Sequence, residues 1–313
     1  MTAPAADDLA ADLGTRLGGT VRGLRRLSGG ASRETWAFDL VRGDGALDEL
    51  ILRRDPPAAP RGGMPREAAL LRAAASAGVP VPEVVDADEA SIVVRRIAGE
   101  TIPRKILRDP DYRDARRSLA SQCGAILARV HTLGPGVVPG LEQVDQVDQW
   151  RAMLDVLGHP HPAFELALRW LHGNRPATAP PTLVHGDFRN GNLVVGPDGV
   201  RAVLDWELAH AGDPIEDLGW LCAKPWRFGV SLPVGGFGSY DDLVQAYEAE
   251  GGRTVDRDAL HWWEVLATLK WGIMCIIQTT AHTSGALRSV ELAALGRRVC
   301  ETEWDLLEML PGA

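Results

Sequence analysis

The segment VHGDFRNGNLVV, residues 184–195, decides how this chain is interpreted. Two short apolar runs, residues 182–184 and 193–195, enclose a stretch that holds a His, an Asp and two Asn. The apolar runs are β-branched and predict strands, whereas the polar stretch with its two glycines predicts a tight loop. A loop held between buried strands directs several side chains to one point. The segment therefore predicts a polar site rather than a plain connection.

A predicted hairpin follows this loop. The turn sequence PDG joins residues 193–195 to the apolar run AVLD, which ends at Asp205. The hairpin would bring Asn192 and Asp205 together, and their amide and carboxylate oxygens are hard ligands that suit Mg²⁺. Asp187 would stand beside the metal without binding it and would accept the proton of an attacking hydroxyl. These residues predict a metal site with a general base beside it.

This arrangement resembles the catalytic loop of the protein kinases and their metal-binding Asp, with HGD in place of HRD and DWE in place of DFG. The pattern HGD-x4-N followed by D-W is more narrowly similar to the aminoglycoside phosphotransferase family. The run that ends in GDPIEDLGWLC looks closest to one branch, whose phosphotransferase-like domains occur alone in bacteria or fused to acyl-CoA dehydrogenases. The resemblance is dense over residues 183–229 and looser over roughly 20–310.

The resemblance implies an α+β, bilobal protein-kinase-like fold. It has a small β-sheet N-lobe with one main helix and a larger, mostly helical C-lobe. The expected activity is ATP-dependent transfer of the γ-phosphate to an alcohol group of a small molecule. Asp187 would be the base, and Asn192 and Asp205 would hold Mg²⁺.

Local signals along the chain agree with two lobes. Before residue 98 the sequence predicts a lead-in helix, a β-hairpin over residues 27–41, further strands, and a helix that Pro65 opens and Gly78 closes. We expect the N-lobe to span residues 1–98 and the C-lobe residues 99–313.

The C-lobe sequence has a different period. From about residue 101, apolar residues recur at helical spacing. Two long amphipathic helices are predicted, over residues 259–282 and 286–309.

The N-lobe supplies candidates for nucleotide binding. Ser28, Gly29 and Gly30 lie in the predicted hairpin turn, where glycines let backbone amides approach phosphate oxygens, although a plain turn explains them equally well. In kinases this glycine-containing turn covers the phosphates of the nucleotide, and the strand that follows carries a Lys. The matching residue here is Arg53, which binds phosphate bidentately, and Glu67 in the following helix is its expected partner.

The adenine of ATP or GTP is expected against the joint between the lobes, near Arg95 and Ile97. Arg53 in place of Lys leaves a second interpretation open, a nucleotide-binding pseudokinase with a regulatory role. The presence of Asp187, Asn192 and Asp205 argues against it, because a protein that only binds nucleotide has no need of a base. A metal-dependent hydrolase would leave Arg53 and Glu67 unexplained.

Four polar residues near the loop have structural interpretations. Asp213 precedes Pro214 and is expected to cap a helix. By the resemblance, Asp217 would hydrogen-bond the backbone of the catalytic loop. His185 would support that loop, and His210, which has no partner at ligand spacing, is interpreted as structural.

The sequence leaves the acceptor open. Acidic residues between positions 216 and 264 would suit an aminoglycoside or another antibiotic, but they are more typical of solvated helix faces. The segment CAKPWRFG, residues 222–229, and Arg189 place cations and aromatic rings after the hairpin, which would suit an anionic, partly apolar acceptor. The resemblance to the dehydrogenase-fused branch points to a hydroxyacyl-CoA-type compound.

The composition agrees with an ordinary globular protein. The chain has 313 residues, 45% of them apolar, and its 33 basic and 42 acidic residues give a net charge of −9, which disfavours nucleic-acid binding. Three of the four cysteines lie in apolar runs, which predicts buried thiols in a reducing compartment. With neither a signal pattern nor a membrane-length apolar run, we expect a cytoplasmic protein without membrane partners. The oligomeric state is not indicated.

Overall fold

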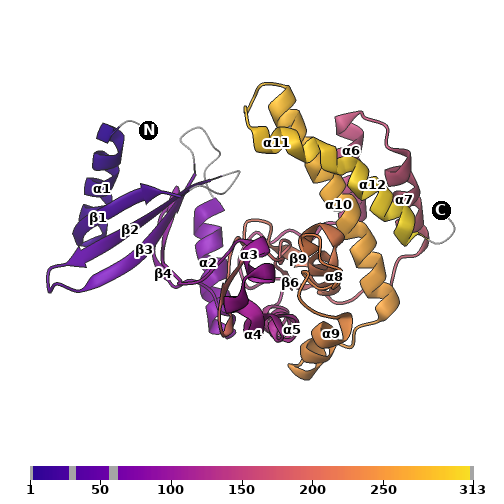
Figure 1. The fold of residues 1–313 in the computed structure, drawn as a ribbon, viewed down its shortest axis with the longest axis horizontal. Helices are drawn as coiled ribbons and strands as arrows, with labels where there is room; N and C mark the ends of the chain where they lie inside the picture. Colours follow the sequence, from indigo (N-terminus) through magenta and orange to yellow (C-terminus); the bar gives the residue numbers. More distant parts are fainter. Residues whose placement is uncertain (1–2, 28–32, 56–62, 311–313) are drawn as a thin grey trace.

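The computed structural model describes residues 3–27, 33–55 and 63–310. Its N-terminal part is a five-stranded sheet with two helices, and its C-terminal part is mostly helical (Figure 1). The predicted α+β, bilobal kinase-like fold class is confirmed. The boundary after residue 98 stays a prediction; residues 96–102 connect the last strand of the sheet to the next helix.

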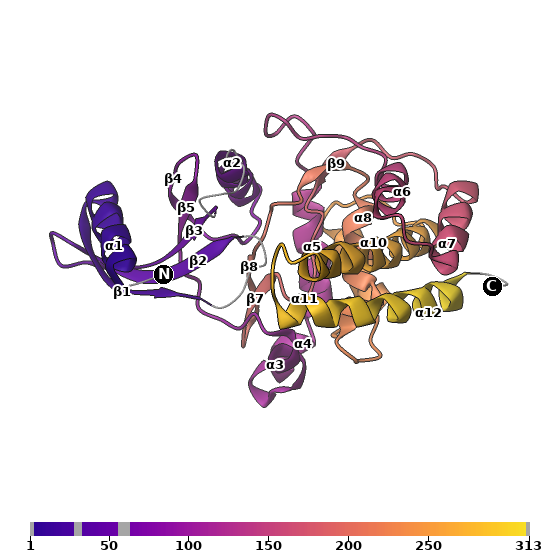
Figure 2. The same cartoon turned by 90° about the horizontal axis from the view of Figure 1, so that it is seen from above.

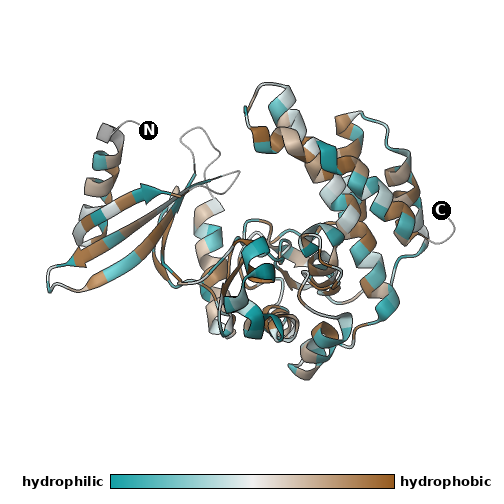
Figure 3. Ribbon diagram, viewed as in Figure 1, coloured by the Kyte–Doolittle hydropathy of each residue, from teal (hydrophilic) through white to brown (hydrophobic). Residues whose placement is uncertain are grey.

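The N-lobe sheet is antiparallel, with strand order β1-β2-β3-β5-β4. Its strands carry both hydrophobic and hydrophilic residues (Figure 3), and successive side chains along a strand face opposite sides of the sheet. On β5, Val93 packs with Phe38 on one face, whereas Ile92 and Val94 join the core on the other. The strands span Gly19–Arg26 (β1), Glu34–Arg42 (β2), Leu47–Arg54 (β3), Val84–Ala87 (β4) and Ser91–Arg95 (β5).

One helix packs on each face of this sheet. Helix α1, Ala3–Leu17, contributes Leu13 to the cluster around β2 and β3, and α2, Gly63–Ser76, packs on the opposite face. The predicted stop after α2 is present, because Gly78 has φ +77°, a conformation that favours glycine. Glu67 of α2 is only 2% exposed, so its carboxylate needs charged partners.

Two pairs of short antiparallel strands surround the loop segment in the C-lobe. The predicted hairpin is confirmed, with Leu193 opposite Val203, and the strand before the loop pairs instead with a strand that follows the hairpin. Their bounds are Thr182–Val184 (β6), Leu193–Gly196 (β7), Gly199–Val203 (β8) and His210–Gly212 (β9). Figure 2 shows β7 and β8 between the N-lobe sheet and the C-lobe helices. The loop over residues 185–192 therefore lies where the two lobes meet.

Helices form the rest of the C-lobe, with α8 packed along α10 behind the loop. The C-lobe helices are Pro103–Arg108 (α3), Arg113–Arg116 (α4), Leu119–Val130 (α5), Gln146–Leu157 (α6), Pro162–Gly173 (α7), Ile215–Cys222 (α8), Tyr240–Ala249 (α9), Arg257–Thr283 (α10), Val290–Leu295 (α11) and Val299–Met309 (α12). Short 3₁₀ turns lie at Pro110–Tyr112, Lys224–Arg227 and Gly296–Arg298. Within the described ranges, no helix is both long and apolar enough to cross a membrane.

The prediction of one continuous helix over residues 286–309 is wrong. The segment forms α11, a 3₁₀ turn and α12. The chain bends at Gly296, which approaches α10 so closely that a Cβ there would lie 2.8 Å from the side chain of Thr279. The predicted helix over 259–282 is confirmed, and α10 ends before Gly285, which has φ +79°.

Candidate active site

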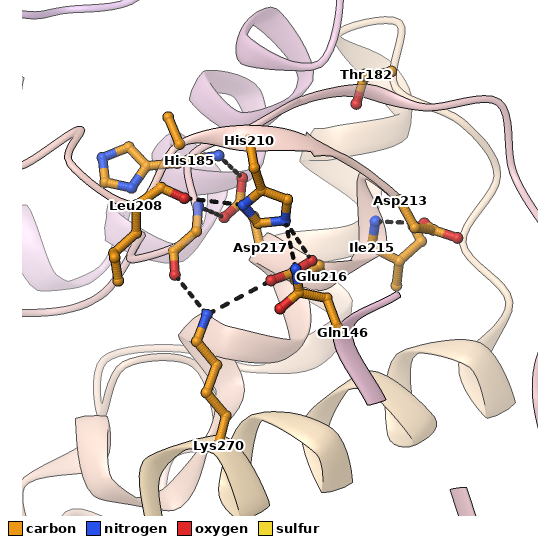
Figure 4. A network of polar contacts seen from close by, with 12 residues as sticks. Gln146, Thr182, His185, Leu208, His210, Asp213, Ile215, Glu216, Asp217 and Lys270 are labelled. Atoms are coloured by element: carbon orange, nitrogen blue, oxygen red, sulfur yellow. Dashed lines mark hydrogen bonds and ion pairs between the residues drawn. The ribbon is translucent and has the colours of Figure 1, made fainter. Parts of the chain in front are cut away.

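Asp217 of α8 holds the loop over residues 185–192 through hydrogen bonds to its backbone. This fully buried carboxylate accepts the backbone N–H groups of His185 at 2.8 Å and Gly186 at 2.9 Å (Figure 4). Burial works against the charged form, but the hydrogen bonds from His131 and from the loop backbone outweigh it, so the pKa of Asp217 lies below its usual value. The predicted support of the loop by Asp217 is confirmed.

His185 is a neutral ring inside this support. Its Nε2 lies 3.1 Å from the backbone oxygen of Leu204, which only accepts, and its Nδ1 accepts the N–H of Asp187 at 3.2 Å. Burial lowers the pKa of His185 despite the carboxylates around it. The ring ties the loop to the segment after β8, as predicted.

The glycine of HGD is required by its surroundings. Gly186 has φ +78°, and a Cβ there would lie 2.4 Å from the backbone oxygen of Leu208. Any other residue at this position would meet both backbone strain and a steric clash. The loop therefore reaches Asp187 through a turn that only glycine makes easily.

The carboxylate of Asp187 accepts three hydrogen bonds from the described residues. Its Oδ1 accepts the indole N–H of Trp220 at 2.8 Å and the Nε–H of Arg189 at 3.0 Å. Its Oδ2 accepts the amide of Asn192 at 2.6 Å. Because each carboxylate oxygen has two lone pairs, these donors fill Oδ1 and leave one position on Oδ2. That position is where a hydroxyl would donate its proton to a base.

Asn192 and Asp205 lie at the same end of the β7–β8 hairpin, as predicted. The backbone oxygen of Asn192 accepts the N–H of Leu204 at 2.8 Å, so Asp205 follows directly after this pair. Asp205 has φ +67°, an uncommon value for a residue other than glycine. The backbone turns sharply at this carboxylate, a feature often found at functional sites.

The donor chemistry of these two residues fits a magnesium ion. Asn192 gives its amide N–H groups to Asp187, and no hydrogen bond within residues 3–27, 33–55 and 63–310 occupies its amide oxygen. In the same ranges, no group of three or more His, Cys, Asp or Glu residues could hold a metal. If Asn192 and Asp205 hold a metal, water or phosphate oxygens would have to supply the remaining ligands, as Mg²⁺ commonly requires.

The predicted pairing of Arg53 with Glu67 is present. Arg53 of β3 donates to one carboxylate oxygen of Glu67 and, through Nη2, to Asp205 Oδ1 at 2.8 Å. Burial disfavours the charged guanidinium, but Glu67 and Asp205 outweigh it and raise the pKa of Arg53. Arg33, which was not predicted, donates to the second oxygen of Glu67 and lies 3.6 Å from Glu207.

The other nucleotide candidates stay predictions. Ser28, Gly29 and Gly30 fall outside the described residues. The side chain of Arg95 is exposed and forms ion pairs with Asp48 and Glu83 on the surface of the sheet. Ile97 is half-buried in the connection between the lobes.

Two further predictions concern α8 and its neighbour β9. Asp213 was predicted as the N-cap, but α8 begins one residue later than predicted and its N-cap position is Pro214; Asp213 precedes it and accepts the N–H of Ile215 at 2.9 Å. His210 lies 3.0 Å from Glu216 and 3.3 Å from Gln146 (Figure 4). Burial lowers the pKa of His210, but the Glu216 carboxylate outweighs burial and raises it above the usual value.

Two of the cations proposed for an anionic acceptor are occupied elsewhere. Lys224 pairs with Asp305 of α12. Arg227 pairs with Glu264 of α10 at 2.6 Å. Lys224 and Arg227 therefore connect parts of the C-lobe to each other. Of the three proposed cations, Arg189 is the one that contacts Asp187.

Trp220 and Lys270 contact the loop and were missed from the sequence. Trp220 follows Asp217 by three residues, so both lie on one face of α8, and this spacing is a usable signal. Lys270 is an isolated charge in the apolar middle of α10 and is only 5% exposed. Its Nζ donates to the backbone oxygen of Gly186 at 3.0 Å (Figure 4).

A pocket of about 220 Å³ opens on this side of the loop. Its wall includes Trp150 of α6, Arg66 of α2, His210 and Lys270. Aromatic, cationic and polar groups meet in this pocket, which Lys270 connects to the loop through its bond to Gly186.

A bilobal fold in which a strand cation pairs with a buried Glu of the N-lobe helix is typical of kinase-like phosphotransferases. Residues 23–263 match the phosphotransferase enzyme family (APH). The chain belongs to this family.

Its curated relatives are of two kinds. The chain is 32% identical over 231 residues to mouse acyl-CoA dehydrogenase family member 10 and 33% identical over 236 residues to chicken family member 11. These matches cover 67% and 69% of this chain but only 21% and 30% of the relatives, so the chain spans less than a third of their length. Hygromycin-B 4-O-kinase of Escherichia coli is 26% identical over 231 residues, 66% of this chain and 64% of that protein.

Solved structures share the whole fold. A choline/ethanolamine kinase family protein from Mesorhizobium loti superimposes with a TM-score of 0.69 at 23% identity, over 97% of this chain and 94% of that one. A spectinomycin phosphotransferase, solved in complex with ADP and spectinomycin, has a TM-score of 0.70 at 13% identity, over 97% and 99% of the two chains. At these identities the likeness supports the fold alone.

Proposed function

We propose that this chain is an ATP-dependent small-molecule kinase that transfers the γ-phosphate to a hydroxyl group. The proposal is carried by one observation: Asn192, which donates to Asp187, lies at the same hairpin end as Asp205, and Arg53 joins Asp205 to the N-lobe. Asp187 takes the proton of the hydroxyl at the open position on Oδ2. Arg53 holds phosphate oxygens, and Mg²⁺ on Asn192 and Asp205, when bound, neutralises phosphate charge.

For the acceptor we propose a hydroxyacyl thioester of the CoA type. Support comes from the relatives named acyl-CoA dehydrogenase family members. The pocket of about 220 Å³ lined by Lys270 and His210 is smaller than typical ligand pockets, so it would take one end of the acceptor and leave the carrier outside. An aminoglycoside is the second candidate, favoured by the likeness to hygromycin-B 4-O-kinase and by Glu142 and Glu207 in the wall of the same pocket.

The kinase proposal is tested first by nucleotide binding. We expect ATP or GTP to raise the melting temperature of the chain in the presence of Mg²⁺ and much less in its absence. Asp205→Ala should remove the Mg²⁺-dependent part, whereas Asp198→Ala, an exposed Asp at the hairpin turn, should retain it. The absence of a shift with either nucleotide at millimolar concentration would reduce the kinase proposal to a likeness of fold.

The acceptor is tested by ADP release with Mg²⁺-ATP. A series of hydroxyacyl-CoA compounds with the hydroxyl at different carbons is compared with the matching acyl-CoA compounds, which lack the hydroxyl, and with hygromycin B. Turnover that requires the hydroxyl supports the thioester. Turnover with hygromycin B alone favours the aminoglycoside.

A further inference from the structure

A closed ring of contacts surrounds Oδ1 of Asp187. Trp220 and Arg189 both donate to this oxygen, at 2.8 and 3.0 Å. The Arg189 guanidinium lies over the ring of Trp226, 4.4 Å from its centroid, and Trp226 packs against Trp220 with a centroid separation of 5.2 Å. The two donors are therefore fixed through Trp226 as well as through the carboxylate.

Lys270 fixes the same unit from the other side. Its Nζ lies 4.5 Å from the centroid of the Trp220 ring and donates to the backbone oxygen of Gly186, the residue before Asp187. Trp220 and Lys270 are both at least nine-tenths buried, so neither side chain is free to turn away. A rigid group of this kind holds the base in one orientation, which a precise catalytic geometry requires.

We infer that Trp220 is a positioning residue, whose indole N–H holds Oδ1 of Asp187 so that Oδ2 alone meets the acceptor hydroxyl. This inference rests on the proposed kinase function for its effect on rate, but the hydrogen bond itself can be tested without any activity. Asn192 orients the carboxylate from the Oδ2 side, and Trp220 does so from the Oδ1 side. Loss of the Trp220 N–H would leave Oδ1 with the longer bond from Arg189 alone among the described donors, and would weaken the hold on the carboxylate.

The rate test uses Trp220→Phe in the full chain, with Mg²⁺-ATP and water as the acceptor. The variant keeps an aromatic ring and loses the N–H. We expect kcat for ADP formation to fall about tenfold, with KM for ATP within about twofold. Trp263→Phe is the matched control, because this buried Trp also packs between α8 and α10 and its N–H has no hydrogen-bond partner in the described part of the chain. An equal loss in the control would overturn the inference.

A double-mutant cycle separates positioning from general packing. If Trp220 acts only through Asp187, adding Trp220→Phe to Asp187→Asn should change the remaining rate by less than about twofold. Losses that multiply would show that Trp220 acts elsewhere and would overturn the inference.

A spectroscopic test covers the cases in which the variant does not fold or the chain has no kinase activity. In ¹⁵N-labelled protein, the indole proton resonance of Trp220 should move when Asp187→Asn replaces the carboxylate, while that of Trp263 stays in place. If the Trp220 resonance moves but the chain binds no nucleotide, the hydrogen bond to Asp187 is supported and the kinase proposal is refuted. A stationary Trp220 resonance would refute the positioning role, whatever the activity.

Discussion

Arg53 donates a hydrogen bond to Asp205 across the two lobes, with 2.8 Å between Nη2 and Oδ1. The other terminal nitrogen of the same guanidinium pairs with Glu67 of α2. A lysine has a single ammonium nitrogen and cannot hold two carboxylates in one planar fork. Arginine at this strand position therefore links the N-lobe helix to the proposed metal ligand, and the site retains the cation that phosphate binding needs.

The role of Arg53 predicts an order among its variants. Arg53→Met removes the charge and should weaken Mg²⁺-ATP binding by about tenfold or more, whereas Arg53→Lys keeps the charge, loses the fork and should fall between Met and the native chain. Isothermal titration calorimetry measures both. Arg25→Met, at an exposed position of β1, is the control for the loss of one positive charge. Native affinity in Arg53→Met would remove Arg53 from the nucleotide site.

Asp187→Asn separates catalysis from binding. The amide keeps the shape of the side chain but cannot take a proton, so turnover should fall by about a hundredfold or more. ATP affinity should change only a few fold, because Asp187 binds neither phosphate nor metal in this scheme. Steady-state kinetics and titration calorimetry test the two halves, with Asp198→Asn as the control at the exposed turn. Unchanged turnover would exclude Asp187 as the base.

The sequence predicted the loop and its partners well, because local signals determine them. Two apolar runs, a turn sequence and the spacing between Asp187 and Asp205 suffice to place a base beside a hairpin end, and the hairpin is present. The Arg53–Glu67 pair was found by resemblance to the kinases. Its second bond, to Asp205, is a contact between residues far apart in the chain, which no local pattern indicates.

Tertiary packing determines what the sequence did not predict. The break at Gly296 depends on the approach of α10, and the ion pair of Lys224 with Asp305 depends on where α12 lies. Trp220 was one of ten tryptophans, most of which are buried in the cores. Its contact with Asp187 requires that α8 pass behind the loop, and this placement follows from the whole C-lobe.

The buried carboxylate of Asp217 should contribute strongly to stability. In Asp217→Asn one acceptor becomes a donor, which then faces the N–H of His185 or Gly186. We expect the free energy of unfolding at pH 7 to fall by about 3 kcal/mol. Urea unfolding followed by circular dichroism measures it, and Asp241→Asn, an exposed residue of α9, is the control.

The pH dependence of this difference has a definite sign. Because the pKa of Asp217 is lowered in the folded chain, its stabilisation is present above the unfolded value, about 4, and is lost as pH falls through the folded value. The difference between native chain and Asp217→Asn should therefore shrink below about pH 4. A difference that grows on acidification would contradict the lowered pKa.

His210 should give the opposite pH dependence. Its pKa is raised because Glu216, 3.0 Å away, outweighs the cost of burial and the charge of Lys270. A raised pKa stabilises the fold fully below the unfolded value, about 6.5, and this contribution is lost as pH rises through the folded value. In His210→Gln the contribution is absent, because the amide does not titrate. The difference in unfolding free energy between native chain and variant should therefore be larger at pH 5.5 than at pH 8.5.

The comparison isolates His210 from the other histidines. Burial lowers the pKa of His185, so that ring favours the folded state as pH rises, which opposes the trend from His210 in the native chain. Because both proteins contain His185, its contribution cancels in their difference. His159→Gln, which leaves the Glu216 network intact, is measured alongside as a second His→Gln variant. A difference for His210→Gln that is flat from pH 5.5 to 8.5 would mean that Glu216 does not hold a charged His210, and the network beside the loop would then be neutral at that ring.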